Sequence, residues 1–456
     1  MGSVFSRVED LVSGLLPMTF LVFSGLYFTI KTKGMQFRKF FTAIKFALSP
    51  TKQENNGISS FGAVCNSLAA TVGTGNIAGV AAAISIGGAG AVFWMWVSAF
   101  LSMVVKSAEI VIALFYRSEN EYKGGPMYYI NRGLGKAFKP LAVVFCVAGV
   151  FSAFSTGNIT QINACVSVMS SSNWIKFIIG TVFSLSVAMI ISGGAKKITA
   201  VTTAVLPLMS TFYIVFCLGV IAKNYKLLGD ALLCIFKGAF SPHSVTGGVV
   251  GSVYTTVITG AQKGVFSNET GLGTAAMAHT EARDAKIETQ GFYGIFEVFV
   301  DTLLICTLTA LTILCSGVII DYSTVESSGL VSRAFSTLYG GFSPKVLAIM
   351  LSFFAISSVI GWAAYGINCS EFLFGIKGRR LFVAIYPLFC IVGAMARVDY
   401  VFRLAEFFNG IMLIINVFVV LMLSSSAIMV LKGENDGKKN REAKERPTKR
   451  SGNAYF

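Results

Sequence analysis

Residues 71–76 read TVGTGN and residues 267–273 read SNETGLG, and each stretch lies inside a long apolar segment. Glycine and polar residues in the middle of a membrane-length segment are expected to break its helix. Broken backbone is tolerated at bilayer depth only where it lines a cavity or is buried in protein. Two such segments at matching places in two halves of a chain indicate the binding site of a secondary transporter.

Composition supports a membrane location. The chain has 456 residues, of which 54% are hydrophobic and only 13% charged, whereas a soluble domain has about 25% charged residues. The sequence therefore predicts a polytopic membrane protein with lipid as its surroundings. The net charge of +15 does not indicate nucleic acid as a partner, because the basic residues lie in short loops and in a tail.

About 20 apolar residues are needed for a helix to cross a bilayer. The segments that meet this requirement predict about eleven spans: 11–30, 59–86, 91–116, 140–169, 174–193, 199–222, 246–279, 290–318, 344–374, 380–395 and 403–431. The stretch 35–48 has Phe, Ile and Leu on one face and basic residues on the other, which predicts an interfacial amphipathic helix. The stretch 226–240 is a second candidate for such a helix.

The distribution of lysine and arginine predicts the orientation. Alternate loops and the tail hold 26 of the 37 basic residues, and loops rich in lysine and arginine face the cytoplasm. We therefore expect the N-terminus outside and the C-terminus inside. The tail, 432–456, is polar and basic and is expected to be disordered.

The predicted spans form one transmembrane domain over 1–431. Residues 1–58 would add a helix and an interfacial segment before two repeats, 59–222 and 246–431. Each repeat holds five spans and begins with a broken helix, and the two repeats start on opposite sides of the membrane. This spacing predicts an all-α protein with an inverted five-plus-five repeat, as in sodium-coupled carriers.

The first break offers two kinds of ligand group. Gly73 and Gly75 let a ligand approach the backbone closely. An unwound helix exposes N–H groups, which suit a carboxylate, and C=O groups, which suit a desolvated cation. The alternative is a packing motif, because small residues also let helices approach each other.

The second break adds side chains with oxygen atoms. Ser267 and Asn268 offer ligands for Na⁺ or hydrogen bonds to a substrate, and polar residues at this depth are expected to face the bundle interior. Glu269 could balance a bound cation or an ammonium group. The alternative is that Glu269 pairs with Lys263.

Other spans also carry polar groups. Gln161 lies in the fourth span, and Ser357 and Ser358 lie in the ninth, shortly before Trp362. The serines could complete an oxygen cage for Na⁺ or could bond to their own helix backbone. Trp362 offers a flat apolar wall for a pocket.

Two charged pairs stand at helical spacing. Lys106 and Glu109 lie three residues apart and are expected to pair. Glu297 and Asp301 lie four apart, so both must meet a cation or one must be protonated. This second pair leaves a proton pathway open as an alternative. No Walker loop and no hydrolase motif is present, so neither an enzyme nor an ATP-driven pump is indicated.

Several motifs resemble the alanine or glycine:cation symporter family, over about residues 59–431. They are ATVGTGNIAGVAAAISIGGAGAVFWMWVSAF (70–100), GGPMYYINRGLG (124–135), GNITQINA (157–164), KGVFSNETGLGTAAMAH (263–279), QGFYGIFEVFVDTLLICTLTAL (290–311) and GWAAYG (361–366). The resemblance implies a LeuT-like fold and import of a small neutral amino acid, alanine or glycine, with Na⁺ as the co-transported ion and no organic cofactor.

The resemblance also implies roles for residues. Those implied to bind the substrate are Gly73, Thr74, Gly75, Asn76, Gln161, Ser267, Asn268 and Trp362. Those implied to bind Na⁺, by analogy of fold, are Ala69, Val72, Ser357 and Ser358. Lys263 and Thr270 depart from the family pattern, which has arginine and alanine there, and Ala89 replaces a proline. These departures put substrate preference in doubt more than mechanism.

The expected protein is a symporter of a prokaryotic inner membrane that works by alternating access. An H⁺-coupled carrier of the same fold is the alternative, and a channel or a substrate sensor is a remote one. The amino acid and its enantiomer, the ion stoichiometry and the oligomeric state are not fixed by the sequence.

Overall fold

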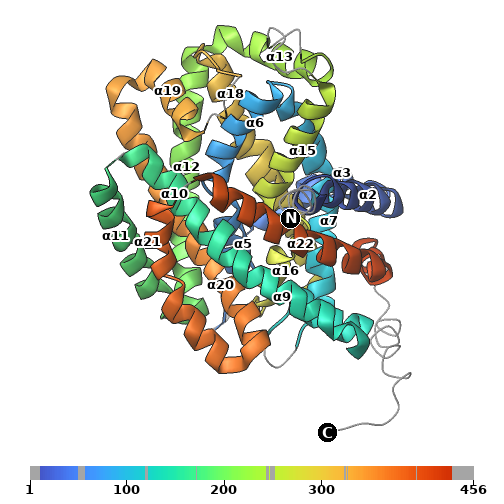
Figure 1. Ribbon diagram of the computed structural model, residues 1–456. Helices are drawn as coiled ribbons and strands as arrows, with labels where there is room; N and C mark the ends of the chain where they lie inside the picture. Colours follow the sequence, from blue (N-terminus) through green and yellow to red (C-terminus); the bar gives the residue numbers. More distant parts are fainter. Residues whose placement is uncertain are drawn as a thin grey trace, which may run out of the picture.

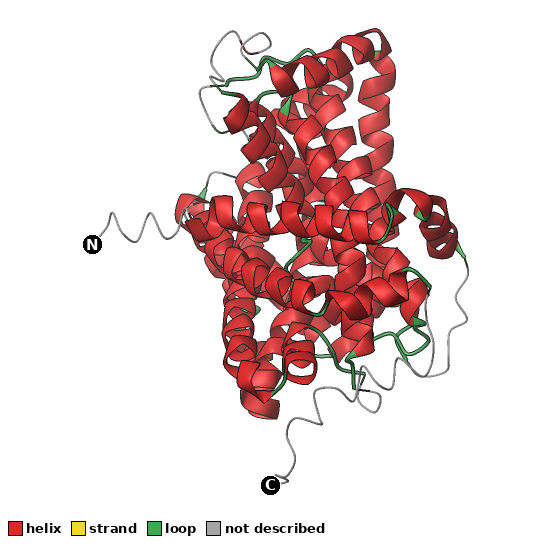
Figure 2. Cartoon of the chain, turned by 90° about the vertical axis from the view of Figure 1, so that its right-hand side faces the viewer, coloured by secondary structure: helices red, strands yellow, loops and turns green. Residues whose placement is uncertain are grey.

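The structure is a computed structural model that describes residues 11–49, 57–118, 122–170, 172–242, 246, 252–322, 325, 327–396 and 398–433. Within these residues the chain is built from helices and loops without a named strand (Figure 2). The α-helices are α2 (Leu16–Lys31), α3 (Met35–Arg38), α4 (Phe40–Leu48), α5 (Ser60–Thr71), α6 (Val80–Gly87), α7 (Ala91–Phe115), α8 (Pro126–Tyr129), α9 (Lys139–Phe154), α10 (Thr160–Met169), α11 (Asn173–Ile191), α12 (Gly194–Lys223), α13 (Leu228–Phe240), α15 (Val253–Asn268), α16 (Thr274–Thr280), α17 (Ile287–Val298), α18 (Thr307–Cys315), α19 (Ser328–Tyr339), α20 (Ser343–Ile385), α21 (Leu388–Met395), α22 (Val398–Met422) and α23 (Ser424–Leu431).

The predicted spans correspond to these helices. In the described chain seven helical stretches are long and apolar enough to cross a membrane, and the bent pair that begins with α5 makes eight. The other three predicted spans coincide with α2, with α15 and α16, and with the end of α20 together with α21. Short π-helical stretches interrupt three spans, at Gly75–Gly79, Ser155–Ile159 and Phe299–Cys306.

The two broken spans run in opposite directions. Figure 1 shows α6 and α15 in the upper part of the molecule and α5 and α16 below them. In agreement with this view, α6 packs against α15 and α5 packs against α16. The first broken span therefore rises from α5 to α6, and the second descends from α15 to α16. Both breaks consequently lie near the middle of the bundle.

The N-terminal elements lie beside the five-plus-five bundle. Helix α2 packs against α7 and α22, and α4 packs against α17, where the ring of Phe40 lies 5.1 Å from that of Phe299. The predicted interfacial helix over 35–48 is two helices, because the backbone leaves helical geometry at Lys39 between α3 and α4. The second interfacial candidate corresponds to α13.

Three further elements differ from the sequence prediction. Helix α19 was not expected, because its segment is too short and too polar to resemble a span. Helix α20 runs through two predicted spans and bends at Gly375, whose φ is 62°. The last span ends at Met422 and α23 follows it, so 403–431 is not one helix. The tail from residue 434 and part of the seventh predicted span, 247–251, lie outside the described residues.

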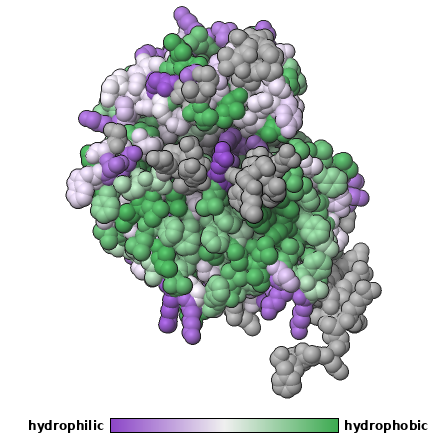
Figure 3. Space-filling model, in the orientation of Figure 1, coloured by the Kyte–Doolittle hydropathy of each residue, from purple (hydrophilic) through white to green (hydrophobic). Residues whose placement is uncertain are grey.

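The polarity of the molecule is inverted relative to a soluble protein. Large apolar side chains on α9, α11 and α12 are exposed, among them Phe151, Leu185 and Leu208. Figure 3 shows hydrophobic residues over a broad area of one face, with hydrophilic residues at its lower edge. Buried positions in the centre hold Asn, Gln, Glu, Asp and Lys side chains. Such a surface is typical of a membrane protein, in which polar residues at bilayer depth face the interior of the bundle.

Candidate functional site

The first break separates α5 from the helical stretch that begins at Gly75. The two parts are bent by 51°, and Val72 between them is extended, with ψ at 93°. The side chain of Asn76 stabilises the turn, because its Oδ1 accepts a hydrogen bond from Gly73 N at 2.9 Å. Gly75 is exposed, and a Cβ added there would meet nothing within 4 Å. The backbone at Gly75 thus faces open space at the level of the break.

The second break covers residues 269–273. Helix α15 ends at Asn268, and Glu269, Gly271 and Gly273 all have positive φ angles before α16 begins. Glu269 lacks the freedom of glycine, so its conformation costs on the order of 1 kcal/mol. Its carboxylate accepts hydrogen bonds from Trp362 Nε1 at 2.7 Å and from Thr274 Oγ1 at 2.8 Å, which offset that strain.

The two breaks meet through side chains. Asn76 Nδ2 in the first break donates to Ser267 Oγ at 3.0 Å and to Asp301 Oδ1 at 2.7 Å. Ser267 Oγ donates to Asp301 Oδ2 at 2.8 Å. Thr309 Oγ1 donates to the carbonyl of Asn76 at 2.9 Å. Three spans, two of them broken, are therefore joined at this point by buried polar groups.

The fourth and ninth spans supply the walls around the first break. Gln161 Oε1 accepts hydrogen bonds from Thr74 N at 3.1 Å and from Thr74 Oγ1 at 2.8 Å. Trp362 is fully buried and lies against Gly157, where an added Cβ would come within 2.2 Å of Trp362 Cβ. The structure thus places Gln161 beside Thr74, and Trp362 beside Glu269.

The residues predicted to bind Na⁺ lie together in the structure. Ser357 Oγ donates to the carbonyl of Ala69 at 3.2 Å. Ser358 Oγ is buried and has no hydrogen-bond partner among the described residues. It lies beside the first break, because a Cβ added at Gly73 would be 2.4 Å from it. Val72 is buried in the same segment. Carbonyl and hydroxyl oxygens are suitable ligands for a hard cation, so this group fits Na⁺.

Asn268 has a different place from the other predicted substrate residues. Its side-chain nitrogen donates to Thr302 Oγ1 at 3.2 Å, and its Oδ1 accepts from Thr270 N at 3.1 Å. Asn268 is fully buried. The side-chain amide of Asn268 therefore stabilises the conformation of the second break.

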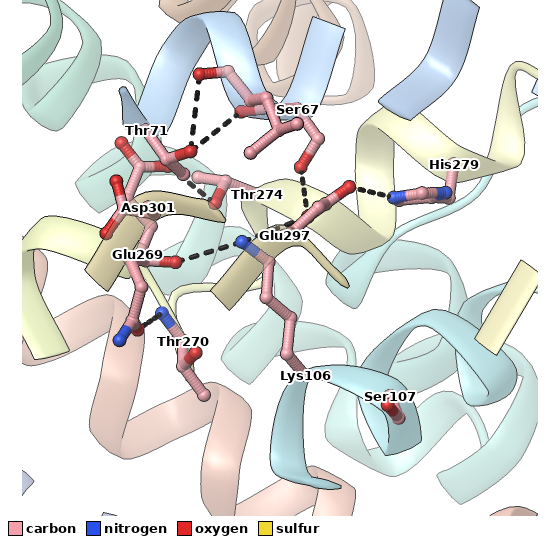
Figure 4. Close-up of polar contacts among 12 residues, drawn as sticks. Ser67, Thr71, Lys106, Ser107, Glu269, Thr270, Thr274, His279, Glu297 and Asp301 are labelled. Atoms are coloured by element: carbon pink, nitrogen blue, oxygen red, sulfur yellow. Dashed lines mark hydrogen bonds and ion pairs between the residues drawn. The ribbon is translucent and has the colours of Figure 1, made fainter. Parts of the chain in front are cut away.

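One predicted ion pair is wrong, and one pairing that was considered as an alternative is not formed. Lys106 lies 3.0 Å from Glu297 Oε2 and does not pair with Glu109, which accepts from Asn416 Nδ2 at 2.7 Å. Lys263 pairs with Glu406 at 3.3 Å and not with Glu269. In each case a partner on another span lies closer than the one along the chain. Figure 4 shows Lys106 reaching between the second break and Glu297, with His279 on the other side of that carboxylate.

Glu297 and Asp301 do not act as one pair. Glu297 contacts Lys106 and His279, whereas Asp301 contacts Asn76 and Ser267. The contribution of Asp301 to the meeting point of the breaks was not predicted. The sequence feature that could have indicated this role is a carboxylate, followed by Thr302, inside an apolar span.

A separate cavity of about 240 Å³ is lined by residues of α12 and α20 and by the segments that precede α5 and follow α16. Its charged and polar lining residues are Tyr122, Lys123, Lys196, Glu281, Arg283, Asn368, Glu371 and Arg379. Lys123 pairs with Glu371 at 3.1 Å. Burial raises the pKa of Glu281, which lies beyond the end of α16, to about 7.

A helical bundle with two oppositely directed broken spans, whose breaks meet at its centre, defines a secondary transporter. The chain belongs to the sodium:alanine symporter family, whose profile matches residues 1–450. It is therefore a membrane symporter of the Na⁺ and amino-acid class and not an enzyme.

Similar proteins agree with this assignment. The sodium/alanine symporter AgcS of Methanococcus maripaludis is 37% identical over 454 residues, which cover 97% of this chain and 99% of AgcS. The amino-acid carrier protein AlsT of Bacillus subtilis is 35% identical, with 90% and 88% covered. The crystal structure of MhsT in complex with L-phenylalanine has a TM-score of 0.59 at 14% identity, with 86% of this chain and 96% of MhsT covered. MhsT supports the LeuT-like fold alone.

Proposed function

We propose that this protein imports alanine, glycine or a similarly small neutral amino acid together with Na⁺. The observation that supports the proposal most is the contact of Asn76 with Ser267 and Asp301, which joins the two breaks. A ligand bound beside Gly75 would touch both broken spans. It could therefore stabilise an arrangement of the two repeats, as alternating access requires.

The substrate carboxylate is proposed to bind at the backbone of residues 73–76, beside Gly75. In this structure the N–H groups of Gly73 and Thr74 donate to Asn76 Oδ1 and Gln161 Oε1, so the carboxylate would take the place of these acceptors. Gln161, Ser267 and Trp362 would surround the amine and the side chain, and Asn268 would hold the second break in place. Na⁺ would bind the carbonyls of Ala69 and Val72 with the hydroxyls of Ser357 and Ser358. The unpartnered hydroxyl of Ser358 supports this last assignment, because a buried polar atom without a partner is costly.

The names of two relatives support alanine, or more broadly an amino acid, as the substrate: AgcS is called a sodium/alanine symporter and AlsT an amino-acid carrier. A third relative, GlnT of Bacillus subtilis, is 33% identical and is called a probable sodium/glutamine symporter. A larger neutral amino acid is therefore the first alternative substrate to test. These relatives are archaeal and bacterial, which supports a prokaryotic cell membrane. The distribution of lysine and arginine is the basis for proposing the N-terminus outside and the C-terminus in the cytoplasm.

Proteoliposomes that contain the purified protein provide the test. Labelled alanine is added outside under an inward Na⁺ gradient, with K⁺ in place of Na⁺ as the control. Accumulation that needs Na⁺ and is competed by glycine is the expected result. Absence of alanine and glycine uptake under Na⁺, with uptake of glutamine, would contradict the proposed substrate but not the coupling.

An H⁺-coupled carrier is the second candidate. Asp301 forms no ion pair with a lysine, arginine or histidine of the described chain, so it is available to a proton or a metal ion. The relative YrbD of Bacillus subtilis, 31% identical, is called a putative sodium/proton-dependent alanine carrier. Uptake that follows an acid-outside gradient and ignores Na⁺ would favour this candidate.

A further inference from the structure

Lys106 is an unusual residue for the centre of a membrane protein. It lies in α7 and is fully buried. Its Nζ is 2.9 Å from the carbonyl oxygen of Asn268 and 3.0 Å from Glu297 Oε2. Asn268 is the last residue of α15, so the break has released its carbonyl from the helical hydrogen-bond pattern. The ammonium group thus binds a backbone oxygen that exists because the helix is broken.

The surroundings of the ammonium group resemble the ligand set of a hard cation. Besides the Asn268 carbonyl and the Glu297 carboxylate, the hydroxyl of Ser67 donates to the same Oε2 at 2.7 Å. Carbonyl, carboxylate and hydroxyl oxygens are the groups that bind Na⁺ at unwound helices. Figure 4 shows Ser67 and Lys106 meeting at the same carboxylate.

The other oxygen of Glu297 is held by a histidine. His279 Nε2 lies 2.6 Å from Glu297 Oε1, and Gln290 Nε2 lies 2.7 Å from His279 Nδ1. His279 thus links Glu297 to Gln290. The ammonium group of Lys106 reaches the opposite oxygen, Oε2, of the same carboxylate.

We propose that Lys106 is a tethered cation, whose ammonium group permanently fills a cation position at the second helix break. This proposal deepens the proposed Na⁺ coupling and rests on it. A mobile ion is then excluded from the position between Asn268, Ser67 and Glu297, and the coupling ions bind elsewhere. Without Lys106, Glu297 would be a buried carboxylate that has lost its lysine partner, which is unfavourable in a protein interior.

The proposal predicts that removal of the tether creates an ion site. In the Lys106→Ala variant the three oxygen groups remain and the space of the ammonium group is free. We expect this variant to bind about one additional Na⁺ per protein, because the uncompensated Glu297 carboxylate recruits a cation. Equilibrium binding of labelled Na⁺ to the detergent-purified protein gives the count directly.

Lys106→Met is the matched control. Methionine also lacks the charge, but its unbranched side chain occupies the volume that Na⁺ would need. We therefore expect no additional Na⁺ in this variant, and a return to the wild-type count in the double variant Lys106→Ala with Glu297→Gln. A salt bridge with a purely structural role would make the alanine and methionine variants alike.

Two results would overturn the proposal. One is a folded Lys106→Ala protein with the wild-type Na⁺ count. The other is a Lys106→Ala protein that fails to fold at high Na⁺ concentration although Lys106→Met folds, because Na⁺ should replace the ammonium group. The binding count does not depend on the transported amino acid. A wild-type protein that binds no Na⁺ would refute the proposed coupling, whereas an unchanged count in the alanine variant refutes this inference.

Discussion

At the scale of single residues, Gly75 marks the place where the first break faces open space. A Cβ added there meets no atom of the described residues within 4 Å. The fold should therefore tolerate the change, although the added atoms would occupy the position proposed for the substrate carboxylate. A substitution at Gly75 should therefore impair substrate binding without impairing folding.

We predict that Gly75→Val leaves the yield of folded protein unchanged and lowers the apparent affinity for alanine by about tenfold or more, which corresponds to about 1.4 kcal/mol. Uptake at several alanine concentrations measures this effect. Gly79→Ala is the matched control, because a Cβ there also meets nothing within 4 Å. Equal affinities in both variants and the wild type would remove the first break from the substrate site.

Ser358 provides a test of the Na⁺ assignment. Its hydroxyl has no partner among the described residues, so Ser358→Ala breaks no hydrogen bond seen in the structure. We predict that this variant needs about tenfold more Na⁺ for half-maximal uptake, because the loss of one oxygen ligand costs about 1.4 kcal/mol. Ser352→Ala is the control, since Ser352 Oγ donates to its own helix at Ala348 O. An unchanged Na⁺ dependence in Ser358→Ala would place the ion elsewhere.

Glu281 predicts a pH dependence outside the membrane spans. Burial raises its pKa from 4.5 to about 7, and Asn368, Lys123, Lys196, Arg283, Glu371 and Arg379 line the same cavity. Between pH 4.5 and about 7, Glu281 loses its proton in the unfolded chain but keeps it in the folded protein. The stabilisation that comes from protonated Glu281 is therefore fully present below pH 4.5 and is lost as the pH rises through about 7.

We predict that the thermal unfolding midpoint of the purified protein falls by about a few degrees more between about pH 5 and pH 8 in the wild type than in Glu281→Gln. Differential scanning measurements across this pH range provide the comparison. Parallel pH profiles would show that Glu281 does not titrate in the folded protein.

The charged residues show where sequence reasoning ends. The polar composition of the breaks could be predicted, because glycine, serine and asparagine are conspicuous inside apolar spans. The partner of Lys106 could not, because spacing along one helix favours Glu109, whereas the nearest carboxylate belongs to Glu297 on another span. Which spans face each other is decided by packing, and a single sequence carries no direct signal of it.

At the scale of elements, the second break depends on backbone conformations that favour glycine. Gly271 and Gly273 have φ angles of 87° and 77°. A Cβ at Gly273 would also come within 2.2 Å of Pro126 Cγ. Glycine at this point is thus required both by conformation and by the close approach of α8 (Pro126–Tyr129).

We predict that Gly273→Ala destabilises the protein by about 2 kcal/mol or more, because positive φ and the contact with Pro126 both oppose the added methyl group. Gly229→Ala in α13 is the control. It meets nothing within 4 Å, and it should stabilise the protein by about 0.5 to 1 kcal/mol. Thermal unfolding of both variants tests the pair, and equal midpoints would contradict the argument.

Long apolar elements were predictable because bilayer thickness sets their length. Helix α19 was not, since its short segment carries no membrane signal, and neither were the π-helical stretches, whose extra residue per turn leaves no pattern in the composition. One π-helical stretch contains Asp301 and another begins at Gly75. Such stretches often occur at functional sites. The two π-helical stretches, which the sequence did not predict, therefore lie at the candidate site.

At the scale of the whole molecule, the candidate Na⁺ and substrate sites share the first broken span. Ala69 and Val72 lie just before the break, and Gly75 lies just after it. A ligand that stabilises the conformation of this break would also raise the affinity for the other ligand. The coupling between Na⁺ and the substrate would then depend on the conformation of the first broken span.

We predict that Na⁺ and alanine raise each other's affinity by the same factor, on the order of 5- to 150-fold, because coupling free energies are reciprocal. Binding of labelled alanine as a function of Na⁺, and of labelled Na⁺ as a function of alanine, measures both factors. Choline in place of Na⁺ is the control. A factor of one in both experiments would show that the two ligands bind independently, which would contradict coupling through the first broken span.

The pairing of α6 with α15 and of α5 with α16 gives the two ends of the bundle the same construction in opposite orientation. A symporter built in this way can run in either direction, because each step of its cycle is reversible. The combined gradients of the ion and the amino acid then decide the direction of net flow. A cell that loses its Na⁺ gradient would therefore lose its amino acid through the same protein that had collected it.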